Sequence, residues 1–282
     1  MNKYCDLHTH STYSDGTFSP AEIIDAASKL NLSAVALCDH NNINGLNEFV
    51  GASEGKKIEA VPGIEFSVNF DTKKVHLLAL FIKKKYYSDI NEFLTDANIK
   101  KENSNIELTE KLNKAGYLID YSEIKRKTPN GFINRANIAA ELTEKGYTES
   151  TDHAFKTLLS EKAGFYIPAE RLNLFDTLEF IKDIGAVSIL AHPLLNLSEK
   201  ELIECLPRAL SYGLDAIECY HSKYDALMTE SSLSIAKHFN LAVSGGSDFH
   251  GSNKPDVKLG TGNDNLKIPA DILDLLKLRI KI

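Results

Sequence analysis

Seven short apolar stretches of the chain carry a histidine, aspartate or glutamate, mostly at their C-terminal ends, and a helix-like segment usually follows each one. Their length and β-branched content predict buried strands. The stretches are YCDLHTH (4–10), AVALCDH (34–40), IEAVPGIEFS (58–67), VHLLALF (75–81), AVSILAHP (186–193), DAIECYH (215–221) and LAVSGGSDFH (241–250). Strands that alternate with helices form a parallel sheet, so the pattern predicts an α/β fold.

A barrel is the form of that sheet that best explains where the polar residues fall. In an α/β barrel, the functional groups collect at the C-terminal ends of the strands, on one face of the molecule. Side chains from distant parts of the sequence then meet at a single mouth. We therefore expect a barrel in which these strands share one site.

Helix signals between the strands support this alternation. Ser19 and Glu22 have the spacing of a capping box, with Pro20 at the first helical position. The buried face expected for the following helix consists of Ile23, Ile24, Ala27 and Leu30. A similar periodicity at 269–280 predicts a final helix.

The interval between His76 and His192 is far longer than one crossover requires. Helix or turn patterns within it cover residues 88–115, 129–132 (PNGF), 134–147 and 151–164. We expect residues 98–168 to form a helical insert domain over the barrel mouth. Residues 1–97 and 169–282 would then form the barrel domain.

The composition disfavours several classes of protein. No stretch approaches the roughly 18 apolar residues of a membrane helix, and residues 1–20 lack the features of a signal peptide. The four cysteines form no CxxC pair, which is typical of reduced thiols, so we expect a cytoplasmic protein without a membrane partner. A net charge of −7 disfavours nonspecific binding to long nucleic acid. No protein partner can be inferred.

His8 and His10 end the first stretch, and alternate residues of a strand point to the same side. Alone, such a pair is more simply two hydrogen-bonded surface histidines. The rest of the chain changes this balance by adding residues of the same kind at other strand ends and in the first turn. These residues are Asp15, Asp39, His40, Glu65, His76, His192, His221, Asp248 and His250.

Buried carboxylates and imidazoles in this number favour a metal cluster. Glu65 interrupts an otherwise apolar strand, where a carboxylate is costly unless it is paired or binds a metal. Imidazole and carboxylate ligands without thiolates suit Zn, Mn or Fe(II), and so many ligands suit two or three ions. We expect Cys5, Cys38 and Cys219 to be small core residues.

The motifs DLHTHSTYSDGTFSP, VALCDHN, GIEFS, VHLLAL, LAHP and GSDFHG resemble, in this order, those of the PHP (polymerase and histidinol phosphatase) superfamily. The segment RANIAAELTEKGY, followed by AFKTLL, is similar to the insert of bacterial 3′,5′-nucleoside bisphosphate phosphatases and related 5′-to-3′ exonucleases. This resemblance implies a distorted (βα)7 TIM-like barrel with a helical insert. It also implies a site for two or three divalent ions, usually Mn, Fe or Zn.

The resemblance further implies which residues hold each ion. The first ion would be held by His8, His10, Glu65 and Asp248. The second would share Glu65 and add His76 and His192. The third would be held by Asp15, His40 and His250. Asp39 would orient one of the imidazoles without binding an ion itself.

The sequence departs from the family pattern in two places. Cys38 and Asn41 stand where the family often has threonine and aspartate. The segment from Arg135 to Asn137 reads Arg-Ala-Asn where the family often has Arg-Pro-His. Arg135 therefore remains available to bind a phosphate, and Asn137 takes the place of a possible histidine contact.

Such a cluster can hydrolyse a phosphoester, because a metal lowers the pKa of bound water from about 16 to near 7. We expect a hydroxide that bridges the ions to attack phosphorus. His221 is not needed as a ligand and could contact the phosphate or protonate the leaving oxygen, unless it is a rim histidine without a role. Arg135 and Lys162 could bind substrate phosphate, unless they are ordinary surface charges.

These expectations combine into a metal-dependent phosphatase that acts on a small nucleotide such as a 3′,5′-nucleoside bisphosphate, with the insert as a lid. One alternative with the same chemistry is a 5′-to-3′ exonuclease on short oligonucleotides, and another is a histidinol phosphatase. From a different class, the chain could be a metal-stabilised binding module without turnover.

Overall fold

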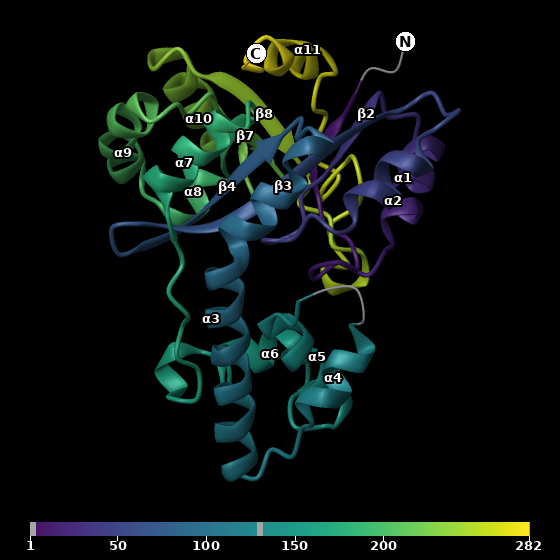
Figure 1. Cartoon of the computed structure of the whole chain (residues 1–282), viewed down its shortest axis with the longest axis vertical. Helices are drawn as coiled ribbons and strands as arrows, with labels where there is room; N and C mark the ends of the chain where they lie inside the picture. The colour runs from purple at the N-terminus through teal and green to yellow at the C-terminus, as the bar shows by residue number, and fades with distance from the viewer. Residues whose placement is uncertain (1–3, 129–131, 282) are drawn as a thin grey trace.

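The strands form one sheet that curves until its two edges meet (Figure 1). A computed structural model describes residues 4–128 and 132–281. Within these residues the strands are β1 (Asp6–Thr9), β2 (Ala34–Leu37), β3 (Glu59–Phe70), β4 (Lys73–Leu80), β5 (Leu172–Asn173), β6 (Val187–Ala191), β7 (Ala216–His221) and β8 (Ala242–Gly246). The sheet order is β1-β2-β3-β4-β6-β7-β8, and the short β5 pairs with β3. The Asp248 amide donates to the His8 carbonyl at 2.9 Å, which nearly closes the barrel between β8 and β1.

The strand directions correct one expectation from the sequence. Most neighbouring strands are parallel, but β4 runs antiparallel to both β3 and β6. The cause is a hairpin: β3 turns into β4 through Asp71 and Thr72, and Asp71 has a φ of 50°. Because β4 is reversed, its N-terminal half lies at the mouth of the barrel. His76 therefore reaches the mouth from near the beginning of its strand.

The helices cover the outside of the barrel or build the insert. They are α1 (Pro20–Lys29), α2 (Leu46–Ala52), α3 (Tyr87–Lys114), α4 (Tyr121–Lys127), α5 (Arg135–Glu144), α6 (Thr151–Lys156), α7 (Leu174–Asp183), α8 (Pro193–Asn196), α9 (Glu199–Ser211), α10 (Ala226–His238) and α11 (Asp271–Lys277), with 3-10 turns η1 (Lys84–Tyr86), η2 (Glu161–Ala163) and η3 (Gly251–Asn253). The capping box of Ser19 and Glu22 is confirmed. Leu30, predicted to be buried, is 52% exposed because α1 ends before it. None of the described helices has the length and apolarity to cross a bilayer.

The barrel interior changes from apolar to polar toward the mouth. An apolar cluster that includes Leu78, Ile189 and Ala216 fills the barrel interior at the end away from the mouth, and α11 covers that end, opposite the insert (Figure 1). Along β7, Glu218 takes the next inward position after Ala216, because alternate strand residues share a face. In β3 and β4, too, the inward-facing side chains change from apolar to ionisable toward the mouth. All four cysteines are buried and unpaired, as expected for core residues.

The insert has a hydrophobic core of its own. Figure 1 shows α3 leaving the barrel and running along α4, α5 and α6. Leu108, Ile124, Ile138 and Ala154 belong to one buried cluster from these four helices. The division at residue 98 stays a prediction, since it falls inside the continuous helix α3. Residues 129–131 of the predicted PNGF turn lie outside the described residues.

Candidate active site

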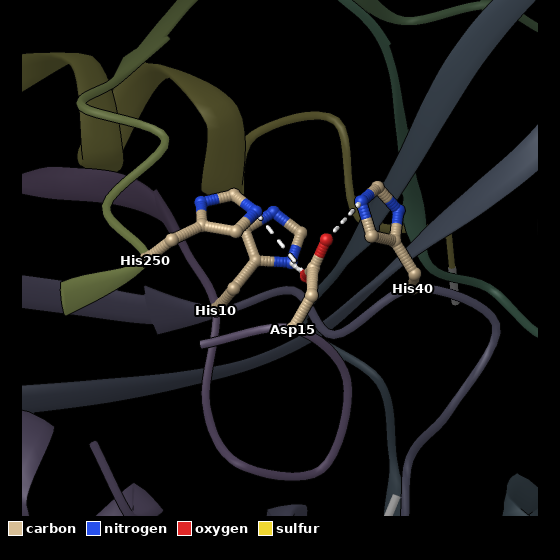
Figure 2. Close-up of side chains that lie close together, drawn as sticks. All are labelled: His10, Asp15, His40 and His250. Atoms are coloured by element: carbon tan, nitrogen blue, oxygen red, sulfur yellow. Dashed lines mark ion pairs between the residues drawn. The ribbon is translucent and has the colours of Figure 1, made fainter. Parts of the chain in front are cut away.

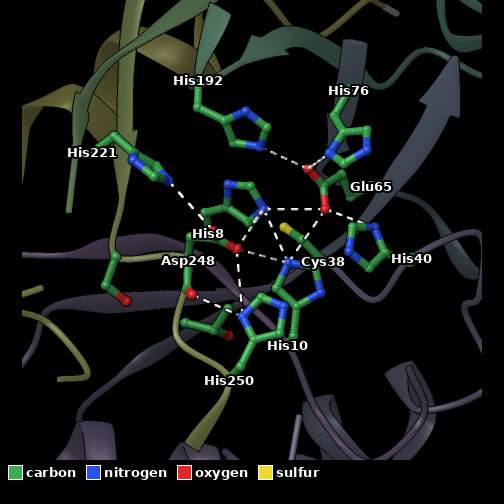
Figure 3. Close-up of polar contacts among 12 residues, drawn as sticks. His8, His10, Cys38, His40, Glu65, His76, His192, His221, Asp248 and His250 are labelled. Carbon is green, nitrogen blue, oxygen red and sulfur yellow. Dashed lines mark hydrogen bonds and ion pairs between the residues drawn. The ribbon is translucent and has the colours of Figure 1, made fainter. Parts of the chain in front are cut away.

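Imidazoles and carboxylates from almost every strand of the barrel converge at its mouth (Figure 3). Some lie within strands and others in the loops that follow them. They are His8, His10, Asp15, His40, Glu65, His76, His192, Asp248 and His250, the nine residues that the resemblance assigns to metal ions. His192 and Asp248 have positive φ angles of 30° and 58°. Side chains with a Cβ seldom adopt that conformation, and it is found most often where function requires it.

The Glu65 carboxylate lies at the centre of this group (Figure 3). Its Oε1 is 2.8 Å from His76 Nδ1 and 3.1 Å from His192 Nε2. Its Oε2 is 2.9 Å from His40 Nδ1, 3.3 Å from His10 Nε2 and 3.5 Å from His8 Nε2. Burial would raise the pKa of Glu65, but the surrounding imidazoles hold it well below the usual value. Glu65 is therefore an anion shared by ring nitrogens from five places in the barrel.

A second group surrounds Asp15, which lies between the rings of His250 and His40 (Figure 2). Asp15 Oδ1 is 3.2 Å from His250 Nε2 and 3.7 Å from His10 Nδ1, and Oδ2 is 3.7 Å from His40 Nε2. One donor atom from each of these four residues lies within 4.8 Å of the others. This spacing is suitable for sharing a single cation.

Asp248 connects the two groups. Its Oδ1 is 3.3 Å from His10 Nε2, and its Oδ2 is 2.6 Å from the ammonium of Lys254. Although burial opposes ionisation, Lys254 and His250 keep the pKa of Asp248 well below its usual value. The sequence analysis did not single out Lys254, because a lysine that follows a strand is common in sequences.

The donor set fits divalent cations. His40 Nδ1, His76 Nδ1 and Glu65 Oε2 are buried and none has a hydrogen-bond partner, although nitrogen and oxygen atoms approach to 2.9 Å. His8 Nε2 and His10 Nε2 lie only 3.1 Å apart. Buried polar atoms are normally satisfied, so several unsatisfied donors around one carboxylate are unusual. Imidazole nitrogens and carboxylate oxygens at this spacing could hold metal ions.

Asp39 does not contact an imidazole, which differs from the expectation. Its carboxylate accepts hydrogen bonds from the Ser11 amide at 2.8 Å and the Ser11 hydroxyl at 2.6 Å, and from the Ser14 hydroxyl. Ser14 Oγ in turn lies 3.4 Å from His10 Nδ1. The two serine side chains occupy the Asp39 carboxylate because the loop after β1 folds back over it. Asp39 therefore fixes the loop that carries Asp15.

His221 lies at the end of β7, next to the cluster. Its ring is fully buried, with Nε2 3.5 Å from Asp248 Oδ2 and Nδ1 accepting from the Lys223 amide at 3.1 Å. Burial lowers the pKa of His221. His221 is not among the residues that line the cleft beside the cluster. Its contact with the substrate phosphate or the leaving oxygen stays a prediction.

Glu218 is a buried carboxylate of the cluster that the sequence analysis missed. It lies in β7, 3.1 Å from His8 Nδ1, and accepts a hydrogen bond from the His192 amide at 2.8 Å. A usable signal existed, because Glu218 stands in the apolar run AIECYH just as Glu65 stands in GIEFS.

A cleft of about 220 Å³ separates the cluster from the insert. Asp15, His40 and His76 line its barrel side. The insert side and the segment returning from it contribute Lys101, Ser104, Asn105, Asn134, Arg135, Phe155, Tyr166, Glu170 and Arg171, and Glu170 is paired with Lys100. The Arg135 guanidinium stacks 4.1 Å above the Tyr166 ring. The cleft thus joins a group of metal-ligand side chains to a group of cations.

The other predicted substrate contacts lie elsewhere. The Asn137 side chain accepts a hydrogen bond from the Asn134 amide at 2.7 Å and caps α5. Lys162 is exposed on η2 and does not line the cleft. Of the three insert residues named from the sequence, Arg135 alone borders the cleft. Lys101 and Arg171 were not predicted, since neither belongs to a sequence motif.

A barrel with a histidine–carboxylate cluster at its mouth defines the class of metal-dependent α/β-barrel hydrolases. The PHP domain model matches residues 6–170, and the chain belongs to the PHP domain family.

Similar proteins agree on the chemistry. A 5′-3′ exoribonuclease of Haemophilus influenzae is 31% identical over 89% of this chain and 91% of its own length. A 3′,5′-nucleoside bisphosphate phosphatase of Chromobacterium violaceum is 28% identical, with 98% and 97% covered. The solved structure of a metal-dependent phosphoesterase from Bifidobacterium adolescentis superposes with a TM-score of 0.88 at 26% identity, covering 99% of this chain and 96% of that one. The protein is a phosphoesterase, and the alternative of a binding module without turnover is set aside.

Proposed function

We propose that this enzyme removes a phosphate from a 3′,5′-nucleoside bisphosphate. The observation that carries the proposal is the cleft, which has metal-ligand side chains on one side and three cations on the other. A substrate with two phosphates can place one at each side. The named activity of the Chromobacterium violaceum relative supports the same substrate class.

The proposed metal centre contains two or three divalent ions, and Mn, Fe and Zn all suit its donors. When bound, such ions supply a nucleophilic water at neutral pH and neutralise charge on the phosphoryl oxygens. The residues that would hold them are His8, His10, Asp15, His40, Glu65, His76, His192, Asp248 and His250. Glu65 contacts imidazoles of both neighbouring groups, so we expect it to hold their relative position.

The three cations are suited to the phosphate that does not react. Among the described residues, no carboxylate forms an ion pair with Lys101, Arg135 or Arg171. The Nη1 atom of Arg171 is buried without a hydrogen-bond partner. A guanidinium left unpaired next to a cleft is ready to bind a phosphate through two parallel hydrogen bonds. In a chain with a net charge of −7, this local excess of positive charge attracts a small anion.

A substrate panel tests the proposal. Phosphate release with added Mn²⁺ is compared for 3′-phosphorylated AMP, AMP, a short 5′-phosphorylated oligonucleotide and histidinol phosphate. We expect the highest kcat/KM for 3′-phosphorylated AMP and a much lower value for AMP, which lacks the second phosphate. Equal kcat/KM values for 3′-phosphorylated AMP and AMP, or a higher value for histidinol phosphate, would show that the second phosphate is not recognised.

A 5′-3′ exoribonuclease activity is the second candidate, favoured by the relative of that name in Haemophilus influenzae. The same cations could hold the 5′ end of a short RNA while a neighbouring phosphodiester lies at the metals. Release of mononucleotides from the oligonucleotide in the same panel distinguishes this activity. A rate above that for 3′-phosphorylated AMP would make it the principal one.

A further inference from the structure

We infer that Glu218 is a positioning residue for the metal centre, one that sets the orientation of two ligands from different strands at once. The inference rests on the metal centre of the proposed function and extends it to a residue outside the ligand set. Glu218 has 0% exposed surface and lies at the inward face of β7. A buried carboxylate of this kind must be fully bonded to be tolerated.

Both carboxylate oxygens of Glu218 are used by candidate ligands. Oε1 lies 3.1 Å from Nδ1 of His8, which belongs to β1. Oε2 accepts a hydrogen bond from the backbone amide of His192, at the end of β6, at 2.8 Å. One side chain in β7 therefore ties together the ends of two other strands.

The contact with His8 determines which ring nitrogen faces the cluster. When Nδ1 carries the proton that it donates to Glu218, Nε2 keeps its lone pair. His8 Nε2 lies 3.5 Å from Glu65 Oε2 and 3.9 Å from Asp248 Oδ1. An imidazole held by a carboxylate in this way is oriented for a metal and becomes a more basic ligand.

The contact with His192 holds a strained backbone. His192 has a φ of 30° and a ψ of 52°, a left-handed conformation that a residue with a Cβ adopts only when its surroundings require it. Its ring is directed to Glu65, with Nε2 3.1 Å from Oε1. The hydrogen bond from its amide to Glu218 stabilises the turn that gives the ring this direction.

Glu218 is placed to act through these ligands and not as a ligand itself. A carboxylate oxygen of Glu218 and one ring nitrogen each of His8 and His192 form a group of possible ligand atoms no more than 4.8 Å apart. However, the carboxylate faces Nδ1 of His8, whereas Glu65 and Asp248 face Nε2 across the ring. Nε2, the nitrogen of His8 that would hold an ion, is therefore on the other side of the imidazole from Glu218.

The test is a metal titration of the full-length protein without substrate. Glu218→Gln has the same shape but can accept only one of the two hydrogen bonds. Metal-free wild type and variant are titrated with Mn²⁺ and Zn²⁺, and bound metal is counted by elemental analysis. We expect the variant to bind the same number of ions at saturation, with an affinity for at least one ion lowered about 10–100-fold.

Asp215→Asn is the matched control. Asp215 is a buried carboxylate just before the same strand, but it is bonded to Ser188 at 3.0 Å and Lys281 at 2.9 Å and touches no candidate ligand. We expect this variant to lower Tm while leaving the metal affinities within about twofold of wild type. If it weakened metal binding as much as Glu218→Gln, the effect would be one of general stability and the inference would be wrong.

Three further results would overturn the inference. Unchanged affinities in Glu218→Gln would show that it positions nothing, and the loss of one ion at saturation would make Glu218 a direct ligand. If Glu218→Gln did not fold, Glu218→Asp would be titrated in its place. Metal affinities equal to those of the wild type in Glu218→Asp, whose side chain is shorter by one methylene group, would also contradict the inference. Because no substrate is present, an error in the proposed substrate would leave these measurements untouched, whereas a wild type that bound no ions would contradict the metal centre itself.

Discussion

The barrel mouth and the insert face each other across one cleft, but their ionisable groups differ in whether they have partners of opposite charge. At the mouth, each carboxylate is surrounded by imidazoles, and Glu65 alone lies within 3.5 Å of five ring nitrogens. On the facing side, Lys101, Arg135 and Arg171 have no carboxylate partner among the described residues. The mouth could therefore hold metal ions, and we propose that the facing side binds an anion.

This difference assigns separate tasks to the two regions. A group that bears on the reacting phosphate affects kcat, whereas a group that binds the substrate equally in the ground and transition states affects KM. We therefore expect substitutions at the mouth to lower kcat and substitutions on the cation side to raise KM. The predictions below are arranged by the size of the expected effect.

The largest effect is expected from removing a ligand side chain at the mouth. His10→Ala, His192→Ala and Asp248→Ala should each lower kcat on the order of 1,000-fold, because a metal contributes several kcal/mol to the transition state. Steady-state kinetics with saturating Mn²⁺ measures this. His238→Ala, at an exposed histidine of α10, is the control and should behave as wild type. Near-normal turnover in the three variants would abolish the distinction between the regions.

A smaller effect is expected on the opposite side of the cleft. Arg135→Ala and Arg171→Ala should raise KM for a nucleoside bisphosphate about 10–100-fold, because a hydrogen bond to a charged group contributes about 1.5–3 kcal/mol. Their kcat should change much less. Arg208→Ala, which removes a guanidinium stacked on Phe175 behind the barrel, is the control. A fall in kcat without a change in KM would place these arginines in the chemistry.

The pH dependence of KM tests the contribution of one cation, Lys101, on the insert side of the cleft. Burial lowers the pKa of Lys101 from its ordinary value to about 8. Since the lysine loses its charge as the pH rises through this value, KM for an anionic substrate should rise by up to about tenfold between pH 7 and 9. Lys101→Arg stays charged and should flatten the rise. An identical rise in that variant would assign the titration to another group.

The smallest effect is expected for Lys162. Its ammonium is exposed outside the cleft, so Lys162→Ala should change kcat and KM by less than about twofold. The substrate panel measured with this variant checks the prediction. A tenfold rise in KM would mean that the insert closes on the substrate and brings η2 to it.

The sequence analysis predicted the barrel and named side chains that gather at its mouth, because both depend on local pattern, whereas the role of each side chain stays a prediction. Each strand is recognisable in the sequence as an apolar run, and residues such as His40 and His192 lie at the end of such a run. The reversed direction of β4 was missed, since a two-residue hairpin at Asp71 and Thr72 carries no glycine or asparagine to mark it.

The cation side of the cleft was harder to predict. Lys101 and Arg171 are far apart in sequence and lie among many other surface-like charges, and only the path of the insert brings them together. Asn137 and Lys162 were predicted as substrate contacts because they lie near a motif in the sequence. Closeness in sequence does not determine the direction in which a side chain points. Contacts within one strand end can be read from spacing, whereas contacts between an insert and a barrel depend on the tertiary fold.

The central claim is that the mouth of this barrel binds several divalent ions, and elemental analysis of the purified protein tests it most directly. We predict two or three equivalents of Mn, Fe or Zn per chain, falling by at least one in His10→Ala. Less than one equivalent after incubation with each of these metals, or a metal content unaffected by loss of His10, would contradict the account.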